Sequence, residues 1–403
     1  MTASEPRAMA RGMLIGLIGF LTLVDLFAAQ AILPTLAKMY AVAPSAMGVA
    51  VNASTIGMAA AGLVVALVSH RLPRRGGIWV SLALLAIPTA LLAHAPDLAT
   101  FTALRIVQGV FMSAAFTLTM AYLSEQNTGA ATAGALAAYI TGNVASNLAG
   151  RLVSSSVAAV AGVAVNFYVF AALNLAGAAL VFLTLTGAPA MGVAMGEMRR
   201  SALARIAAHF GNRCLVASFG IGFCVLFAFL GTFTYVNFVL AAPPLSLKPM
   251  ALGLVYFVFL PSMVTTPLAG AVASRFGPRP TFFASLGLAV AGLPLLLAGA
   301  IVPVIAGLTM VGVGTFFAQA TATGFVGRAA RTDRAAASGI YLASYYLGGL
   351  AGAAVLGQVY DRLGWPAAVA VVGISLIAAA GLAALLRPAT AGAPSARMAI
   401  QAA

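Results

Sequence analysis

Long stretches without a charged residue recur along almost the whole chain, and they constrain its fold more than any other feature. A helix needs about 20 mainly apolar residues to cross the hydrocarbon core of a bilayer. Hydrophobic residues make up 62% of the chain and charged residues 7%, whereas a soluble globular domain carries about 25% charged residues. This composition excludes a soluble globular domain and a disordered chain, and it predicts a polytopic membrane protein.

The uncharged stretches divide into twelve candidate membrane spans. In the first half they are residues 13–33, 46–69, 78–93, 99–123, 131–157 and 163–187, and in the second half residues 214–241, 249–273, 281–300, 302–327, 336–359 and 366–386. Pro88 and Pro294 interrupt the third and the ninth span. Helices of this length satisfy their backbone polar groups internally, as the bilayer core demands. The sequence therefore predicts an all-α membrane protein with twelve transmembrane helices.

The lysine and arginine residues fall mainly on one side of this predicted topology. An even number of spans places both termini on one side, and 16 of the 21 basic residues lie there. The opposite side receives Lys38, Lys248 and Arg362, while Arg105 and Arg151 lie inside spans. Because cytoplasmic loops carry the excess of basic residues, we expect cytoplasmic termini in a bacterial-type inner (plasma) membrane. The net charge of +14 then follows from topology and does not indicate a nucleic-acid partner.

The two halves of the chain resemble each other at an offset of about 204 residues. The segments 66–75 and 270–279 each follow the second span of their half and carry arginine at two matching positions. A stretch with small and basic residues separates the halves. Paired six-helix halves are typical of transporters with a central site that is exposed alternately to each side. We therefore expect an N-terminal six-helix bundle at 1–187, a cytoplasmic linker at 188–213 and a C-terminal six-helix bundle at 214–403.

Several local motifs resemble those of the major facilitator superfamily over nearly the full length of the chain. The fourth span carries the sequence Leu-Arg-Ile-Val-Gln-Gly at 104–109, and the loops at 66–75 and 270–279 resemble the family's cytoplasmic Gly-x-x-x-Asp-Arg-x-Gly-Arg-Arg motif. His70 and Ser274 occupy the acidic position of that motif. Further segments resemble the twelve-span drug- and sugar-efflux branch of the family, namely 140–143, 149–152 and 345–349. The resemblance implies two pseudo-symmetric six-helix bundles, proton antiport, and a role in proton coupling for the fourth-span arginine, Arg105.

Three ionisable residues stand well inside the predicted spans, and they are Asp25, Arg105 and Arg151. A charge at this depth is costly, so such residues mark functional sites by default. At 1.5 Å per residue, Asp25 lies about 18 Å from the cytoplasmic end of its span and Arg105 about 9 Å from the outer end of its own, which brings them to nearly the same depth. We interpret Asp25 as the exchangeable proton carrier and Arg105 as the charge that loads or releases its proton. A static ion pair between two helices is the alternative.

Arg151 gives these three residues a net charge of +1. An uncompensated arginine would favour an anionic solute such as a carboxylate, so the alternative function is an organic-anion uniporter or exchanger that uses Arg105 and Arg151. Arg151 is also placed to reach the outer interface or to bond backbone carbonyls, in which case it has no role in binding.

Other polar and aromatic residues of the spans are expected to line a central cavity that suits an amphiphilic solute. Together with Arg151 they form the predicted substrate-binding set: Asn52, Phe116, Tyr139, Asn143, Asn147, Tyr235, Asn237, Tyr256, Gln319 and Tyr345. For any one of them, helix packing or an interhelical hydrogen bond is a sufficient explanation.

The loop arginines predict a cytoplasmic gate. Arg71, Arg75, Arg275 and Arg279 are placed to close the inward end against helix C-termini or against Glu125, near the end of the fourth span. The positive-inside rule accounts for the same arginines equally well.

Other chemistry finds no support in the sequence. His70, His94 and His209 fall in predicted loops, so no metal site is expected, and no phosphate-binding Gly-x-x-x-x-Gly-Lys loop is present. We expect no catalytic residues and no cofactor. The main hypothesis is a monomeric, proton-coupled secondary transporter that exports a small organic solute by antiport across the lipid bilayer. A non-transporting receptor on the same fold is a further alternative.

Overall fold

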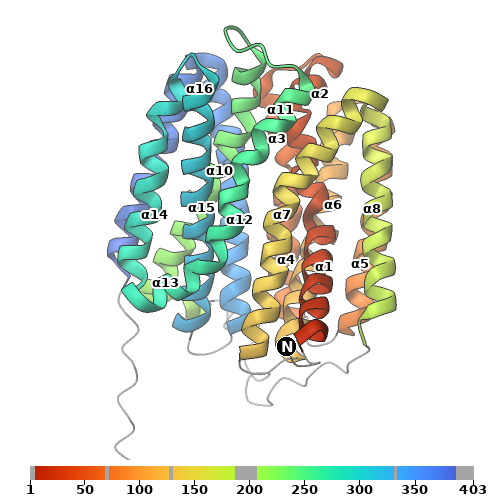
Figure 1. Cartoon of the computed structure of the whole chain (residues 1–403), viewed down its shortest axis with the longest axis vertical. Helices are drawn as coiled ribbons and strands as arrows, with labels where there is room; N and C mark the ends of the chain where they lie inside the picture. The colour runs from red at the N-terminus through yellow and green to blue at the C-terminus, as the bar shows by residue number, and fades with distance from the viewer. Residues whose placement is uncertain (1–4, 69–71, 127–129, 187–206, 331–333, 387–403) are drawn as a thin grey trace, which may run out of the picture.

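The computed structural model describes residues 5–68, 72–126, 130–186, 207–330 and 334–386. Every regular element in these ranges is a helix, and the long helices run side by side in one bundle (Figure 1). Eleven segments of the described chain are long and apolar enough to cross a membrane, and the last, Ala336–Ala384, has 49 residues. A single crossing needs about 20 residues, so this segment supplies two spans. The prediction of an all-α protein with twelve membrane-spanning helices is confirmed.

The first six spans lie together on the side of Figure 1 that carries the N-terminus. They are built from α1 (Glu5–Ala31), α3 (Pro44–Asn52) with α4 (Ser54–Val68), α5 (Arg74–Leu91), α6 (Leu98–Glu125), α7 (Ala130–Ala161) and α8 (Val163–Thr184). The short helix α2 (Leu33–Met39) lies between the first two spans, and η2 (Leu92–His94) continues α5 to the end of the third span.

The second six spans lie on the opposite side of the bundle. They are built from α10 (Arg213–Ala241), the series α11 (Pro249–Val255), η3 (Tyr256–Phe259), α12 (Leu260–Thr265), η4 (Thr266–Leu268) and α13 (Ala269–Phe276), then α14 (Pro278–Gly292) with η5 (Pro294–Leu297), α15 (Ile301–Ala329) and α16 (Arg334–Ala384). Most of the predicted linker, residues 188–206, lies outside the described residues.

Prolines and one glycine explain where spans depart from single helices. Pro261 and Pro267 have no N–H to donate, and the eighth span turns to 3-10 geometry beside them, in η3 and η4. Pro88, by contrast, stays within the last turn of α5. The long element α16 breaks at Gly364, where φ is 80° and ψ is −177°. Glycine tolerates this positive φ without steric cost, and Pro366 follows two residues later, so the eleventh and twelfth spans are separate helices.

Glycines bring long helices of each half into close contact. A methyl group on Gly142 of α7 would collide with the carbonyl oxygen of Gly16 in α1. One on Gly348 of α16 would collide with the carbonyl oxygen of Phe223 in α10. Gly348 and Phe223 follow Gly142 and Gly16 along the chain at nearly the offset of the sequence repeat. The two contacts therefore occupy corresponding places in the two halves. Small residues at such crossings allow the two backbones to approach.

Helix α16 of the second half packs against α4 of the first half along the bundle. The two halves are also in contact at the end opposite the N-terminus of α1, which the positive-inside prediction makes the outer end. There α3 packs against α16, and the backbone N–H of Ser45 donates a hydrogen bond to Asp361 Oδ2 (3.3 Å). Helix α11 packs against α7. The main hydrophobic core includes side chains of both halves, for example Phe27 with Phe229. This contact encloses the polar residues described next.

Candidate functional site

Asp25 of α1 is buried among neutral hydrogen-bond donors. The residue is 1% exposed, and its Oδ2 atom accepts hydrogen bonds from Thr89 Oγ1 (2.6 Å), Gln108 Nε2 (2.7 Å) and Asn174 Nδ2 (3.3 Å). These three partners come from α5, α6 and α8. The amides of Gln108 and Asn174 also donate to the Thr89 hydroxyl. We call these four residues the Asp25 cluster.

Arg105 of α6 lies beside the Asp25 cluster and is completely buried. Its guanidinium donates hydrogen bonds to five oxygen atoms, four of which are Val51 O (2.9 Å), Leu26 O (3.0 Å), Ser54 Oγ (3.1 Å) and Gln108 Oε1 (2.8 Å). Its contact with Asp25 is to the backbone carbonyl oxygen, at 3.5 Å. Among the described residues, no ion pair within 4 Å joins the two side chains.

The pairing expected between Asp25 and Arg105 is therefore indirect in this structure. Gln108 accepts a hydrogen bond from Arg105 through its amide oxygen and donates one to Asp25 through its amide nitrogen. A buried ion must be hydrogen-bonded to offset the loss of water, and here each charge has its own set of polar neighbours. The two depths estimated from the sequence agree with this proximity, but helix geometry alone does not determine which side chain fills the space between them.

Three members of the Asp25 cluster were not predicted from the sequence: Thr89, Gln108 and Asn174. Gln108 could have been predicted, because it stands three residues after Arg105 and therefore lies on the same face of the helix. Thr89 and Asn174 are isolated polar residues in apolar spans, and nothing in the sequence connects them to Asp25.

Arg151 of α7 is completely buried and does not reach the outer interface. Its Nη1 donates to Asn147 Oδ1 (3.2 Å) and to the Asn147 carbonyl (3.3 Å), and its Nη2 donates to Gln30 Oε1 of α1. Four aromatic rings surround the guanidinium, with centroids at 4.6 Å (Phe27), 4.5 Å (Tyr256), 5.0 Å (Phe259) and 6.0 Å (Phe233). Within the described ranges, no carboxylate forms an ion pair with it. The expected backbone bond is present, and side-chain and ring contacts accompany it.

A layer of hydrogen bonds beside this arginine joins the two halves. Gln30 Nε2 donates to Asn52 Oδ1 (2.6 Å), and Asn52 Nδ2 donates to Thr234 Oγ1 in α10 (3.0 Å). Asn237 Nδ2 donates to the Gln30 carbonyl (3.1 Å), and Asn237 Oδ1 accepts from the Tyr256 hydroxyl (2.7 Å). The structure thus brings the predicted residues Asn52, Asn237 and Tyr256 together, with Gln30 and Thr234 as members that sequence analysis missed.

The predicted residues Phe116, Tyr139, Asn143 and Asn147 lie within the first half. Tyr139, Asn143 and Asn147 are buried on α7, and the Tyr139 ring contacts that of Phe116 in α6 at 5.6 Å. Tyr139, Asn143 and Asn147 lie on the same face of α7 as Arg151.

Three other predicted residues lie apart from this group. Tyr235 donates to the Ala353 carbonyl (2.5 Å) and stacks on another ring of α16. Tyr345 packs against neighbouring tyrosines of its own helix, and Gln319 is half-buried on α15. Among the described residues, no hydrogen bond or ring contact joins Tyr235, Gln319 or Tyr345 to the layer around Arg151.

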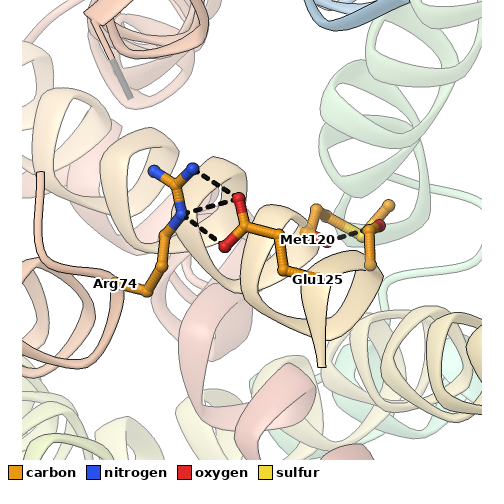
Figure 2. A network of polar contacts seen from close by, with 4 residues as sticks. Arg74, Met120 and Glu125 are labelled. Carbon is orange, nitrogen blue, oxygen red and sulfur yellow. Dashed lines mark hydrogen bonds and ion pairs between the residues drawn. The ribbon is translucent and has the colours of Figure 1, made fainter. Parts of the chain in front are cut away.

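At the predicted cytoplasmic end, the partner of Glu125 is Arg74. Figure 2 shows the two side chains facing each other, with Nε of Arg74 3.0 Å from Oε2 of Glu125. Arg75, the neighbour that sequence analysis chose, instead donates to the Phe182 carbonyl and lies over the Phe182 ring. Successive residues of a helix point about 100° apart, so Arg74 and Arg75 face different neighbours.

The other predicted gate arginines make no described contact across the two halves. Arg275 is exposed and lies over the ring of its neighbour Phe276 (5.2 Å), and Arg279 is half-buried at the start of α14. Arg71 lies outside the described residues.

Two six-helix halves with apolar outer faces enclose buried charges and a polar layer that spans both halves. These features define a polytopic membrane protein with ionisable and polar side chains inside the bundle, where such residues are rare and mark solute or ion pathways.

The chain belongs to the major facilitator superfamily, whose family model matches residues 15–264 and 226–400. The resemblance to this superfamily is therefore confirmed, and the protein is a membrane transporter of the superfamily.

Its relatives include bacterial transporters of similar length. The chain is 24% identical over 362 residues to the MFS-type transporter YybF of Bacillus subtilis, a match that covers 90% of this chain and 89% of YybF. It is 25% identical over 370 residues to the inner membrane transport protein YnfM of Escherichia coli, covering 90% of this chain and 86% of YnfM.

Solved structures support the fold. A bacterial homologue of the human lysosomal transporter Spinster, in an inward-facing and unoccupied conformation, matches with a TM-score of 0.72 at 12% identity and covers 95% of both chains. The nucleoside transporter NupG matches with a TM-score of 0.72 at 13% identity, covering 94% of this chain and 100% of NupG. At these identities the likeness concerns the fold alone.

Proposed function

We propose that this transporter exports a small organic solute in exchange for protons, with Asp25 as the proton carrier and Arg105 as its electrostatic partner. The observation that carries the proposal is the burial of both side chains beside each other, with Gln108 between them and no direct ion pair in the described structure. A small movement of α6 relative to α1 would therefore bring the Arg105 guanidinium into contact with the Asp25 carboxyl group or separate the two.

The physical basis is the cost of charge in a low-dielectric interior. A buried carboxyl group without a cation in contact is favoured as the neutral acid, and one in contact with arginine is favoured as the carboxylate. Alternation between an indirect and a direct Asp25–Arg105 contact would therefore bind a proton in one conformation and release it in another.

Alternating access supplies that movement. We propose that residues 1–187 and 214–403 act as two bundles that rock about the central layer, joined by a cytoplasmic linker at 188–213. The matched close crossings of α7 on α1 and of α16 on α10 support this, since each would let its half move as a unit. The same proposal includes export, cytoplasmic termini and a monomeric state. It also includes a cytoplasmic gate formed by Arg71, Arg75, Arg275 and Arg279, with the Arg74–Glu125 ion pair as an additional contact at that end.

The experiment compares two modes of transport in proteoliposomes for wild type and Asp25→Asn. Labelled small organic solutes are screened for accumulation driven by a pH gradient and for exchange at equal pH on both sides. We expect Asp25→Asn to lose gradient-driven accumulation while it keeps exchange, because exchange needs no net proton movement. Unchanged accumulation in Asp25→Asn would overturn the assignment of Asp25.

A proton-independent organic-anion exchanger is the second candidate, and the burial of Arg151 without a carboxylate partner in the described residues favours it. It predicts that Asp25→Asn changes neither mode of transport, whereas Arg151→Gln abolishes both.

A further inference from the structure

Four polar side chains form a continuous line on one face of α7. Tyr139, Asn143, Asn147 and Arg151 are spaced four residues apart, which places them one above another along a helix. All four point into the protein, with exposures of 0%, 8%, 4% and 0%. We call this line the α7 track.

The α7 track contains buried polar atoms without partners. Nε of Arg151 and both amide atoms of Asn143 have no hydrogen bond of good geometry among the described residues. The hydroxyl of Tyr139 has none either, although it lies near the side chains of Thr22, Thr119 and Asn143. The great majority of buried polar groups in proteins are hydrogen-bonded, so exceptions need an explanation. Several exceptions on one helix face indicate a surface whose partner is a bound molecule.

The charge of the α7 track points to the class of that molecule. Arg151 has no carboxylate partner in the described part of the chain. Among the described residues the one buried acid is Asp25, and it is already held by the Asp25 cluster. An arginine guanidinium is the side chain best suited to bind a carboxylate, because its N–H donors match the two oxygen atoms.

The rings around Arg151 indicate how the site changes during transport. Phe27 belongs to the first half, but Phe233, Tyr256 and Phe259 belong to α10 and η3 of the second half. Aromatic faces stabilise a buried cation, so in this structure the rings take the place of a counter-ion. Rocking of the second half would remove three of the four rings and leave the guanidinium for a ligand that offers both negative charge and apolar surface.

On the basis of the export function proposed above, we propose that the α7 track is the solute-binding surface and that the solute is an organic anion with an apolar or aromatic body. The acid group binds Arg151 and the amide of Asn147, the body packs against the displaced rings, and Asn143 with Tyr139 binds further polar groups. Exchange of one monoanion outward for one proton inward moves two positive charges inward, so an inside-negative membrane potential would drive export.

Equilibrium binding to the purified full-length protein in lipid nanodiscs tests this proposal. The probes are radiolabelled benzoate and benzamide, which share an aromatic body and differ in charge. We expect benzoate to bind at least about tenfold more tightly than benzamide, the size of effect that a charged hydrogen bond produces. Arg151→Gln should abolish this preference, Arg151→Lys should restore part of it, and the matched substitution Arg213→Gln, at an exposed position, should leave it unchanged.

Two results would overturn the proposal: no preference for benzoate over benzamide in the wild type, including no binding of either, or a full preference in Arg151→Gln. Size-exclusion profiles and melting temperatures show whether the variants fold, and Asn143→Leu and Asn147→Leu provide a second route, with weaker benzoate binding expected. The assay uses no proton gradient, and Asp25→Asn should still bind benzoate. Loss of proton coupling and loss of anion selectivity are thus separable outcomes.

Discussion

At the residue scale, the position of Gln108 is the main result, because this neutral side chain stands between the two buried charges that the sequence identified. Its amide has one donor end and one acceptor end, and each faces the charge that suits it. A carboxylate and a guanidinium that touched directly would be held in one arrangement by a strong, hydrogen-bonded pair. The intervening amide keeps the charges close and leaves them free to change their contact.

Replacement of Gln108 by leucine should uncouple transport from protons. Hydrogen bonds to charged groups contribute about 1.5–3 kcal/mol each, so loss of this bridge should reduce gradient-driven accumulation by about tenfold or more. Exchange at equal pH should persist, since Gln108 is not part of the α7 track. Transport by Gln108→Leu in proteoliposomes checks this, with Gln126→Leu at the exposed end of α6 as the matched control. Equal accumulation in the two variants would show that Gln108 has no coupling role.

Sequence analysis located the costly charges but not their partners. Asp25, Arg105 and Arg151 were recognisable because an ionisable residue in an apolar span is rare. Gln30 and Thr234 were not, because the bilayer tolerates single neutral polar residues at many positions and only the packing of distant helices shows which ones meet.

At the scale of elements, close helix crossings depend on the absence of a side chain. Gly142 of α7 contacts the carbonyl oxygen of Gly16, whereas Gly134 on the same helix has no neighbour within 4 Å of the position that a methyl group would take. Gly142→Val should therefore destabilise the protein by about 1–3 kcal/mol through overpacking, while Gly134→Val should show only the smaller helix-propensity cost. Melting temperatures of the two purified variants check the difference, and equal losses would argue against the crossing.

The start of α6 gives a prediction with a defined pH dependence. Asp97 accepts a hydrogen bond from the backbone N–H of Thr100 (2.7 Å), and this bond holds the pKa of the Asp97 carboxyl below its usual value. A lowered folded-state pKa means that the stabilisation is present above the unfolded value, near 3.9, and is lost as the pH falls through the folded value.

Asp97→Ala should accordingly lower the melting temperature at neutral pH and have less effect in acid, below the usual range of aspartate. Asp97→Asn is the control, because asparagine also caps helices but does not titrate. A loss in Asp97→Ala that stayed constant with pH would contradict the capping role of the carboxylate.

Element boundaries were predictable where composition changed and not where backbone geometry changed. The twelve apolar runs were visible in the sequence, and prolines marked the third and ninth spans. The breaks of the eighth span at η3 and η4 were not predicted, although Pro261 and Pro267 signalled them. A proline near a helix end, such as Pro88, is tolerated, so its presence alone does not locate a break.

At the scale of the whole molecule, α16 packs against α4 as well as α3, and the outer end is where α3 meets α16 and α11 meets α7. The charge distribution predicts which end this is. Met39, the last residue of α2, and Phe210, before α10, are both 55% exposed and lie at opposite ends of the bundle, so they form a matched pair for labelling.

In right-side-out vesicles, a membrane-impermeant maleimide should label Met39→Cys, and it should label Phe210→Cys only after permeabilisation. Both substitutions are made in a protein without its native Cys214 and Cys224. The reverse pattern would place the termini outside and contradict the topology predicted by the positive-inside rule.

The central claim is that Asp25 carries the exchanged proton and releases it when the protein changes conformation, and proton release in weakly buffered detergent solution measures this most directly. A solute that the wild type transports is added to purified protein over a series of pH values while a pH indicator dye records released protons. The account predicts a pH-dependent release from wild type and none from Asp25→Asn, although both bind the solute. Equal release from both proteins would contradict it.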